Sequence, residues 1–378
     1  MTDSAPYDII VIGAGIAGAS VAARLAPHRR VLLLERESQA GYHSTGRSAA
    51  MFMESYGPPA VRALTRASRS FFLHPPAGFS DGPLLGPRGA MYLAQTGQQA
   101  QLRALHAELA ANCPQLQALD HAQTLAMLPC LRPEQVHASL VDPLSMDIDV
   151  NALHQGFLRM LRRGGGELRT RAEVSTARRQ NGQWHLTLAD GQLVQAAVVV
   201  NAAGAWADQL GPCFGARSIG LVPHRRSAFT FHAPEAMVIA DWPVVSNLDE
   251  SWYFKPDAGV LLGSPANADP TVPHDVVPEE LDIATAIHHI EEATVLQIRR
   301  PIRTWAGLRS FVPDGELVIG WDRSQEGLFW LAAQGGYGIQ SAPGASALAA
   351  ALLLGQPLPE PLREHGVHAA AVSPLRLC

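Results

Sequence analysis

The chain has 378 residues, which is enough for one large domain or two ordinary ones. Its formal net charge of -5 provides no basic surface for nucleic acid, so we expect no nucleic-acid partner. No apolar run approaches the roughly 18 residues that a membrane-spanning helix needs, so we expect no membrane span.

The N-terminus and the cysteines bear on the cell compartment. The first strand begins almost at once, without the basic and apolar regions of a signal peptide, which predicts a cytoplasmic location. The scattered cysteines Cys113, Cys130, Cys213 and Cys378 have neither redox nor zinc spacing, and the histidines have no metal-ligand spacing. We therefore expect no disulfide framework and no metal.

Residues 7–35 predict a strand, a glycine turn, a helix and a second strand that ends in Glu35. The turn reads Gly13, Ala14, Gly15, Ile16, Ala17 and Gly18. This is the dinucleotide-binding fingerprint in its full βαβ context. Gly13 permits the tight turn, Gly15 lets the backbone approach a pyrophosphate, and Gly18 allows close helix–strand packing. The phosphates would lie at the helix N-terminus and Glu35 would accept the ribose hydroxyls.

The middle of the chain alternates helices and strands. A polar loop at 36–50 is followed by a helix near 58–73, a strand near 89–94 and helices near 98–111 and 120–128. An amphipathic helix is predicted at 149–162 because Leu153, Phe157 and Leu161 have helical spacing. A hairpin at 173–179 and 184–188 and an apolar strand at 196–200 complete this part.

The last part begins with β alternation over residues 218–264, where we expect strands at 227–231, 252–254 and 260–262. A helical pattern at 278–298, strands at 317–320 and 328–332, and a helix at 338–354 follow. The whole order predicts an α/β fold. One nucleotide-binding domain would comprise residues 1–88, 147–217 and 300–378, and an α+β domain with a mixed or antiparallel sheet would comprise 89–146 and 218–299.

The fingerprint alone does not separate NAD from FAD, but three features favour a flavin. The chain has no second GxGxxG motif. The small-residue loop 44–50 can follow a pyrophosphate and a flavin edge. The glycine-rich segment 335–338 opens the last helix, whose N-terminus would stabilise negative charge on a reduced flavin ring.

These motifs, together with the segments 198–206 and 307–315, stand in the order found in the FAD-dependent D-amino acid oxidase and glycine oxidase (DAO) superfamily, which the chain resembles over nearly its whole length. Within it, segments such as 41–50, 225–229 and 304–310 most resemble the bacterial D-arginine dehydrogenases. The resemblance implies a Rossmann-like FAD domain of the glutathione-reductase type, non-covalent FAD and a separate substrate domain.

The resemblance also implies a set of FAD-binding residues. Besides the fingerprint residues 13–18, they are Glu35, Arg36, Ser44, Thr45, Arg47, Ser48, Ala49, Ala50, Val174, Ala203, Gly204, Trp206, Gly307, Arg309, Gly335, Gly336, Tyr337, Gly338, Ile339 and Gln340. The backbone of Val174 would bind adenine. Core packing is the alternative that we favour for Trp206.

By the same resemblance, Arg226 and Arg309 would bind the substrate carboxylate, and Tyr56 and Tyr253 would cover the substrate. A planar guanidinium suits a carboxylate bidentately. A D-amino acid would pass a hydride from Cα to flavin N5, and the imino acid would hydrolyse to a 2-keto acid and ammonia. The alternatives are an interdomain ion pair for the arginines and core packing for the tyrosines. The surrounding pocket residues would be Met51, Met53, Ala90, Val244, Ser246, Gly336 and Gln340.

The chain departs from the D-arginine enzymes at two important positions. The glutamate that binds the substrate guanidinium falls on Ala90, and a histidine near the flavin falls on Met51. Neither residue can pair with a cation, so we expect neutral or apolar D-amino acids to be better substrates than D-arginine. Glu54 lies nearby in the sequence and is the candidate to replace the missing acid.

Lys255 is the only lysine of the chain and precedes Pro256 in a turn, where we expect it to be exposed. Several amine oxidases of the superfamily use a lysine near flavin N5 to promote reaction with oxygen. We therefore favour a dehydrogenase that passes electrons to a quinone or another carrier, and a quinone acceptor leaves peripheral contact with the inner membrane face open. The alternatives are an oxygen-using D-amino acid, glycine or sarcosine-type amine oxidase that releases hydrogen peroxide, a flavin monooxygenase, and a non-enzymatic flavin-binding scaffold.

Overall fold

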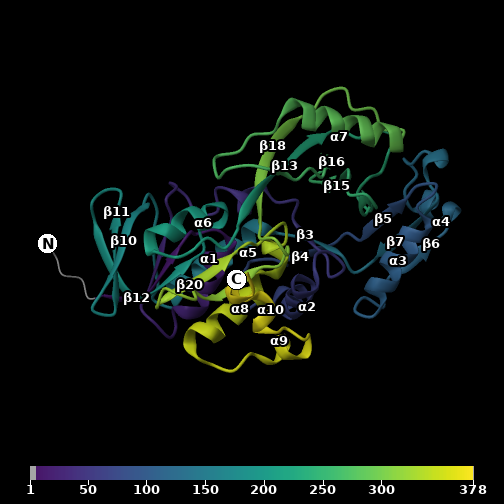
Figure 1. Cartoon of the computed structure of the whole chain (residues 1–378). Helices are drawn as coiled ribbons and strands as arrows, with labels where there is room; N and C mark the ends of the chain where they lie inside the picture. The colour runs from purple at the N-terminus through teal and green to yellow at the C-terminus, as the bar shows by residue number, and fades with distance from the viewer. Residues whose placement is uncertain (1–5, 378) are drawn as a thin grey trace.

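A computed structural model describes residues 6–377 of the chain, so Cys378 lies outside the described residues. Within this range the strands form sheets of eight, nine and three strands. The two large sheets lie in separate lobes, and the small sheet lies where the lobes meet (Figure 1). The α/β fold predicted from the sequence is confirmed.

The eight-stranded sheet carries the fingerprint. Its order is β10-β11-β12-β1-β2-β9, with β20 beside β12 and β19 beside β20. The strands are β1 (Tyr7–Ile12), β2 (Val31–Leu34), β9 (Glu167–Arg169), β10 (Val174–Gln180), β11 (Gln183–Leu188), β12 (Leu193–Asn201), β19 (Val318–Trp321) and β20 (Leu328–Ala332). β1 pairs in parallel with β2 and β12, and its apolar residues are buried because helices cover the sheet.

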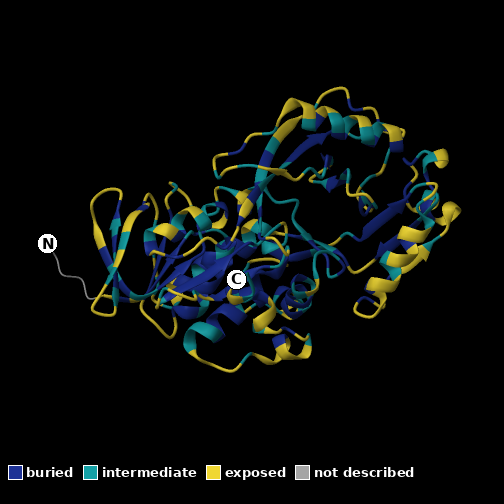
Figure 2. Ribbon diagram, in the orientation of Figure 1, coloured by how far each residue is buried: buried dark blue, intermediate teal, exposed yellow. Residues whose placement is uncertain are grey.

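Helices with small or amphipathic faces pack on this sheet. They are α1 (Ile16–Leu25), α2 (Pro59–Leu73), α5 (Val150–Arg163) and α8 (Gly338–Leu354). α8 packs against both α1 and α2, and α1 also packs against α5. Figure 2 shows this centre as the most continuously buried part of the ribbon. The short helices are α6 (Ala207–Leu210), α9 (Glu360–Glu364) and α10 (Ala369–Val372). α9 packs against α2, and α10 packs against β19.

The nine-stranded sheet forms the second lobe. Its order is β17-β13-β16-β15-β14-β5-β7-β6, with β18 paired to β13. The strands are β5 (Ala90–Ala94), β6 (Gln117–Leu119), β7 (Ala138–Asp142), β13 (Val222–Phe231), β14 (Val244–Asn247), β15 (Tyr253–Asp257), β16 (Val260–Ser264), β17 (Asp269–Pro270) and β18 (Arg303–Phe311). An aromatic core that includes Phe229, Phe231 and Phe254 fills the space under α7 (Glu280–Ala293). At the other end, α3 (Gln99–Ala110) and α4 (His121–Met127) pack on β7.

The small sheet consists of β3 (Met51–Phe52), β4 (Leu85–Pro87) and β8 (Met146–Ile148). The sequence correctly predicted the long helices and most of the longer strands, but it missed these short strands as well as β6 and the buried strands β7 and β14. It also missed β18, which lies inside residues 300–378 and yet pairs with β13 of the second sheet. The domain boundaries stay a prediction. Within residues 6–377, no helix is long and apolar enough to cross a bilayer.

Candidate active site

The fingerprint turn lies between β1 and α1. Gly13 has a φ of 101°, and a Cβ atom there would stand 2.4 Å from the carbonyl oxygen of Ala202, so only glycine fits. The amide of Ile16 in the first turn of α1 donates to the Thr45 hydroxyl at 3.0 Å. Thr45 therefore joins the loop 44–50 to the helix end where free N–H groups attract an anion.

Glu35 is buried at the end of β2 and is held by two backbone amides. Its Oε2 accepts from the Ala14 amide at 2.9 Å, and its Oε1 accepts from the Glu37 amide at 3.0 Å. His154 on α5 supports the turn from below, since its Nε2 lies 2.9 Å from the Ala14 carbonyl oxygen. Burial lowers the pKa of His154, which favours the neutral ring, and the tautomer protonated at Nε2 donates to this oxygen. Sequence reasoning missed His154. The available signal was its position on the buried face of α5, and no motif accompanies it.

A cavity of about 300 Å³ opens beside Glu35. At the edge of this cavity, Arg36 Cζ lies 4.3 Å from the centroid of the Trp206 ring. The ring centroids of His43 and Trp206 are 4.6 Å apart. The structure thus brings together residues that are far apart in the sequence. The predicted residues that line this cavity are Gly13, Gly15, Glu35, Arg36, Ser44, Thr45, Val174, Ala203, Gly204 and Trp206.

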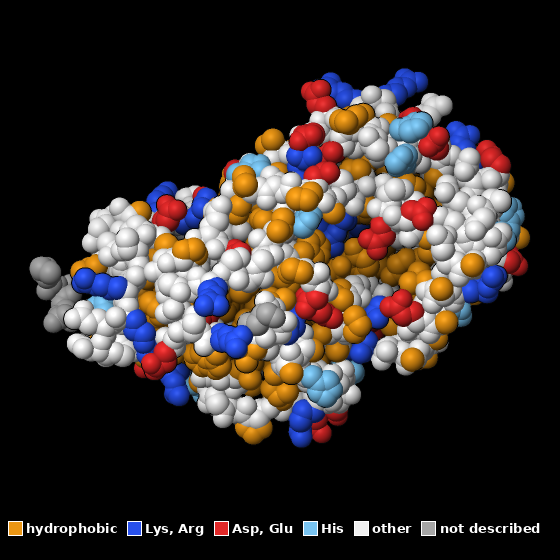
Figure 3. Space-filling view, viewed as in Figure 1, with side chains coloured by type: hydrophobic (Ala, Val, Ile, Leu, Met, Phe, Trp, Pro, Cys, Tyr) orange, Lys and Arg blue, Asp and Glu red, His pale blue; other side chains and the backbone are white. Residues whose placement is uncertain are grey.

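A second cavity of about 260 Å³ continues from the first toward the nine-stranded sheet. Both cavities share Gly15, Ser44, Thr45 and Gly204 in their walls, so they form one elongated cleft that passes the N-terminus of α1. The surface between the lobes is hollowed, and hydrophobic and basic side chains gather there (Figure 3). The predicted residues in the wall of the second cavity include Ile16, Ala17, Arg47, Ser48, Ala49, Ala50, Gly307, Arg309, Gly335, Gly336, Gly338, Ile339 and Gln340.

Three predicted residues line neither cavity. Ala14 and Gly18 are buried in the packing of the fingerprint turn, and Tyr337 stands behind Arg309 and Tyr56. Arg47 contributes to the wall, but its guanidinium donates to the carbonyl oxygens of Val276 and Ala306 at 3.0 and 3.1 Å. That side chain therefore ties the loop 44–50 to the second lobe.

The second cavity ends at two arginines on adjacent antiparallel strands. Arg226 of β13 lies opposite Gly307 of β18, two residues from Arg309, so the two side chains leave the same face of the sheet. Arg226 Nε donates to the main-chain oxygen of Asn267 at 2.6 Å, and Arg309 Nη2 donates to the Tyr56 hydroxyl at 3.4 Å. Within residues 6–377, neither guanidinium has an ion-pair partner, and Arg309 Nε has no hydrogen-bond partner. The alternative of an interdomain ion pair is therefore wrong for both residues.

The two charges affect each other. Burial lowers the pKa of Arg226, and the positive charge of Arg309 lowers it further. Burial also acts to lower the pKa of Arg309, but the nearby Tyr56 and Tyr337 outweigh this effect and raise it. Both groups stay protonated, because an arginine has an ordinary pKa above about 12. Two poorly hydrated cations with free N–H groups at one end of a cavity form a site for an anion.

The family model for FAD dependent oxidoreductases (DAO) matches residues 8–352 of the chain. The chain belongs to this family. The mitochondrial dimethylglycine dehydrogenase of Rattus norvegicus is 25% identical over 364 residues, which cover 89% of this chain and 42% of that protein. This chain therefore spans less than half the length of that relative.

Solved structures of this family have the same fold. Glycine oxidase from Geobacillus kaustophilus superposes with a TM-score of 0.81 at 22% identity, over 94% of this chain and 96% of that one. L-alpha-glycerophosphate oxidase from Mycoplasma pneumoniae, solved with FAD bound, superposes with a TM-score of 0.83 at 18% identity, over 93% and 95%. The family and the cofactor predicted from the sequence are confirmed. The closer resemblance to the D-arginine dehydrogenases stays a prediction.

The cleft of this DAO-family protein fits FAD along its length. The Glu35 end suits the ribose and adenine, and the Gly13 turn beside the N-terminus of α1 suits the pyrophosphate. The walls formed by residues 47–51 and 335–340 then border the space for the flavin ring. In the first turn of α8, Gln340 accepts from the Met53 amide at 3.2 Å and donates to Thr65 Oγ1 at 3.1 Å. It therefore fixes the segment that carries Tyr56.

The tyrosines near the arginines carry hydroxyl groups that can form hydrogen bonds. Tyr56 and Tyr337 meet edge to face with their ring centroids 5.2 Å apart. Burial raises the pKa of Tyr337 to about 12. Tyr253 lies on β15 between Ser246 and Ser264 of the neighbouring strands, and it also lines the cavity. The alternative of pure core packing therefore does not describe Tyr56 or Tyr253.

The rest of the second cavity has an apolar floor. Ala90 pairs in parallel with Val244, and Met51 and Met53 lie beside them. Ala90 is 1% exposed and Met53 is 9% exposed, so the floor continues directly into the core. The predicted pocket residues Met51, Met53, Ala90, Val244, Ser246, Gly336 and Gln340 all line this cavity.

The expectation that Lys255 is exposed is wrong. The residue is 2% exposed, and its Nζ lies 2.5 Å from Asp147 Oδ1 and 3.9 Å from Met51 Sδ. Arg88 donates to the other oxygen of Asp147 at 2.8 Å. A carboxylate that is distant in the sequence thus gives the lysine a buried partner, and the ammonium stays outside the cavity wall.

Two acids near the cleft differ in their roles. Glu54 pairs with Arg69 at 2.7 Å and does not line the cavity, so it does not supply the acid missing at Ala90. Glu250 is exposed but lines the cavity, and its φ of 49° is rare for a residue with a side chain. Its charge contributes to raising the pKa of Tyr337. Sequence reasoning missed Glu250, because no local pattern distinguishes it from a surface acid.

Proposed function

We propose that this FAD-dependent oxidoreductase oxidises D-amino acids with neutral or apolar side chains to imino acids. The observation that carries the proposal is the pair Arg226 and Arg309, which lack carboxylate partners at one end of a cavity with an apolar floor. An α-carboxylate supplies the missing anion, and an apolar side chain covers the floor without burying an unpaired charge.

The chain's own residues orient this substrate. Arg226 and Arg309 hold its carboxylate from one face of the sheet, the Tyr56 hydroxyl lies 3.4 Å from Arg309 Nη2, and Tyr253 lines the same cavity. The side chain then extends over Met51 and its neighbours. Fixing the carboxylate and the side chain leaves Cα with one allowed orientation, which selects an enantiomer and lowers the entropic part of the barrier.

FAD, when bound, supplies the two-electron acceptor. The amino acid loses a hydride from Cα and a proton from nitrogen, and the resulting imino acid reacts with water to give a 2-keto acid and ammonia. The amine must be neutral at the time of the reaction, because its lone pair forms the C=N bond.

The electron acceptor is proposed to be a quinone or another carrier. Lys255 supports this proposal because it is bound to Asp147 behind the wall of the cavity, and the chain has no second lysine. A second candidate function is the oxidation of N-substituted glycines, which the likeness to dimethylglycine dehydrogenase favours. Such a substrate has the same carboxylate but no side chain to cover the apolar floor.

Anaerobic mixing of the purified yellow protein with a panel of amino acids tests the proposal. We expect neutral D-amino acids to bleach the visible flavin absorbance fastest, D-arginine slowly and the L-enantiomers not at all. Bleaching led by D-arginine would overturn the proposed side-chain preference. Bleaching by sarcosine and dimethylglycine alone would move the assignment to N-substituted glycines, and hydrogen peroxide release at each turnover in air would replace the carrier by oxygen.

A further inference from the structure

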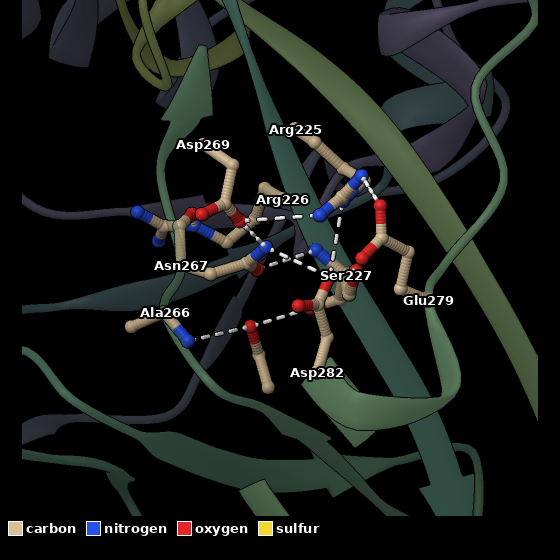
Figure 4. A network of polar contacts seen from close by, with 9 residues as sticks. Arg225, Arg226, Ser227, Ala266, Asn267, Asp269, Glu279 and Asp282 are labelled. Atoms are coloured by element: carbon tan, nitrogen blue, oxygen red, sulfur yellow. Dashed lines mark hydrogen bonds and ion pairs between the residues drawn. The ribbon is translucent and has the colours of Figure 1, made fainter. Parts of the chain in front are cut away.

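Arg226 is held in place by one residue of the neighbouring segment. Its Nε donates to the main-chain oxygen of Asn267 at 2.6 Å, and the next amide, that of Ser227, donates to the side-chain oxygen of Asn267 at 2.9 Å. Asn267 therefore binds two consecutive residues of β13, once through its backbone and once through its side chain (Figure 4).

Carboxylates fix the orientation of the Asn267 amide. Its Nδ2 donates to Asp269 at 2.6 Å and to Asp282 Oδ2 at 3.0 Å. The same oxygen of Asp282 also accepts from the Ser227 hydroxyl at 2.7 Å and from Arg225 Nε at 3.0 Å. Asp282 lies in the first turn of α7, so this helix is connected to Arg226 through the Asn267 amide.

The acids of this network pair with Arg225 and not with its neighbour Arg226. Asp269, Glu279 and Asp282 all pair with Arg225. Burial acts to lower the pKa of Arg225, but Asp282 and Glu279 outweigh this effect and raise it. Arg226 follows directly in the strand and so points to the other face of the sheet. Among residues 6–377, its hydrogen bond goes to the neutral carbonyl of Asn267 and no carboxylate pairs with it, so its positive charge is held in position and is not neutralised.

The backbone before Asn267 has an unusual conformation that serves the same contact. Ala266 has a φ of 51°, which residues with side chains rarely adopt. Its amide donates to the Ser264 hydroxyl at 3.1 Å, and that hydroxyl donates to the Ser227 carbonyl oxygen at 2.7 Å. This turn also lines the cavity at Ala266, so the anchor reaches the substrate site.

The geometry assigns to Asn267 the role of a positioning residue for the substrate carboxylate, with Asp282 as its anchor. Asn267 fixes Nε of Arg226 so that the two terminal nitrogens remain available to a carboxylate of the ligand. This role rests on the proposed function. It concerns carboxylate binding, so it predicts a change in KM and a much smaller change in kcat.

The test uses the FAD-loaded protein and benzoate, a carboxylate without an amine, whose binding is followed through the flavin absorbance spectrum. Asn267→Ala keeps the main-chain oxygen that binds Arg226 but removes the side-chain bonds to Ser227, Asp269 and Asp282 that hold this oxygen in place. It is therefore expected to weaken benzoate binding about tenfold. Asp282→Asn changes one atom and is expected to weaken binding less than this. The matched control is Glu279→Gln, which removes a charge from the same cluster but no contact of Asn267. KM and kcat for the best D-amino acid are measured alongside, and FAD content and the unfolding midpoint verify folding.

Each outcome separates the two claims. Weaker binding and a higher KM in Asn267→Ala and Asp282→Asn, with Glu279→Gln like the wild type, support the anchor. If the wild type binds benzoate and the two variants bind it equally well, the anchor is wrong and the proposed function stands. An equal loss in Glu279→Gln also overturns the anchor, since general charge would then explain it. A wild-type protein that neither binds benzoate nor oxidises an amino acid contradicts both claims. If Asn267→Ala does not fold, benzoate binding by Asp282→Asn compared with the wild type and Glu279→Gln decides whether the anchor is right.

Discussion

Replacing Gly336 by alanine displaces a binding group without removing any charge. A Cβ atom at Gly336 would stand 2.2 Å from both Nε and Nη2 of Arg309 and 2.4 Å from its Cζ. Since such atoms are in contact at about 3.5 Å, the guanidinium must retreat by about 1.3 Å. The rings of Phe311 and Tyr337 flank Arg309, with centroids 5.2 and 5.5 Å from its Cζ, so the retreat also disturbs the contacts that position the guanidinium.

A misplacement of about 1 Å in a positioning group can cost about 100-fold in rate. We therefore expect Gly336→Ala to lower kcat/KM for the best D-amino acid by about 100-fold, which corresponds to about 2.7 kcal/mol. The assay is steady-state turnover with a dye acceptor, normalised to bound FAD because Gly336 also borders the predicted flavin space. Gly82→Ala is the matched control, since a Cβ atom at Gly82 would meet nothing within 4 Å.

The effect of Gly336→Ala must act through Arg309, and a double-mutant cycle tests this. In an Arg309→Met background the guanidinium is already gone, so the added Gly336→Ala should change kcat/KM by less than about threefold. If the two effects multiply instead, or if Gly336→Ala alone keeps wild-type activity, the geometric argument is refuted.

Three further predictions concern residues around the cleft. Protonation of His154 puts a positive charge on a buried ring beside the fingerprint turn. Because burial lowers its pKa in the folded state, stability is full above the ordinary histidine pKa of about 6.5 and decreases as the pH falls below it; FAD affinity should decrease likewise, and both effects should flatten in His154→Gln. Lys255→Met should lower the free energy of unfolding by about 3 kcal/mol in denaturant titrations, because it removes a buried partner of Asp147, while turnover per bound flavin stays near the wild-type value. Ala90→Glu should raise kcat/KM for D-arginine relative to D-leucine by about tenfold, since it places an acid on the cavity floor.

These three predictions have separate controls. A pH profile of FAD affinity that is unchanged in His154→Gln would contradict the proposed support of the fingerprint turn. Loss of turnover in fully loaded Lys255→Met would show that the ammonium acts on the reaction. For the cavity floor, Ala90→Gln has nearly the same size without the charge, and an equal change in specificity there would indicate a steric effect.

The parts of the site that sequence reasoning found are those encoded locally. The fingerprint from Gly13 to Gly18 and the ribose acid Glu35 follow a fixed spacing along the chain, so their contacts could be inferred directly. The closeness of Arg226 and Arg309 depends on the register between β13 and β18, which lie far apart in sequence. That pair came from the family resemblance, and the structure supplies its physical basis.

The misses have a common cause, which is a partner distant in sequence. Lys255 was expected to be exposed because it precedes Pro256 in a turn, but Asp147 reaches it from another sheet. Neither Asn267 nor Glu250 was predicted as a site residue, since an amide and a surface acid are ordinary residues for a loop. Their significance comes from the neighbours that the fold provides: Asn267 binds Arg226, and Glu250 lines the cavity.

The central claim is that Arg226 and Arg309 bind a substrate carboxylate. Its most direct test compares the anaerobic rate of flavin bleaching by D-leucine with the rate for isoamylamine, the matching amine without the carboxylate. The account predicts rapid bleaching by D-leucine and bleaching at least about 100-fold slower by the amine, because the fixed orientation of Cα is lost. Equal rates with the two compounds would contradict it.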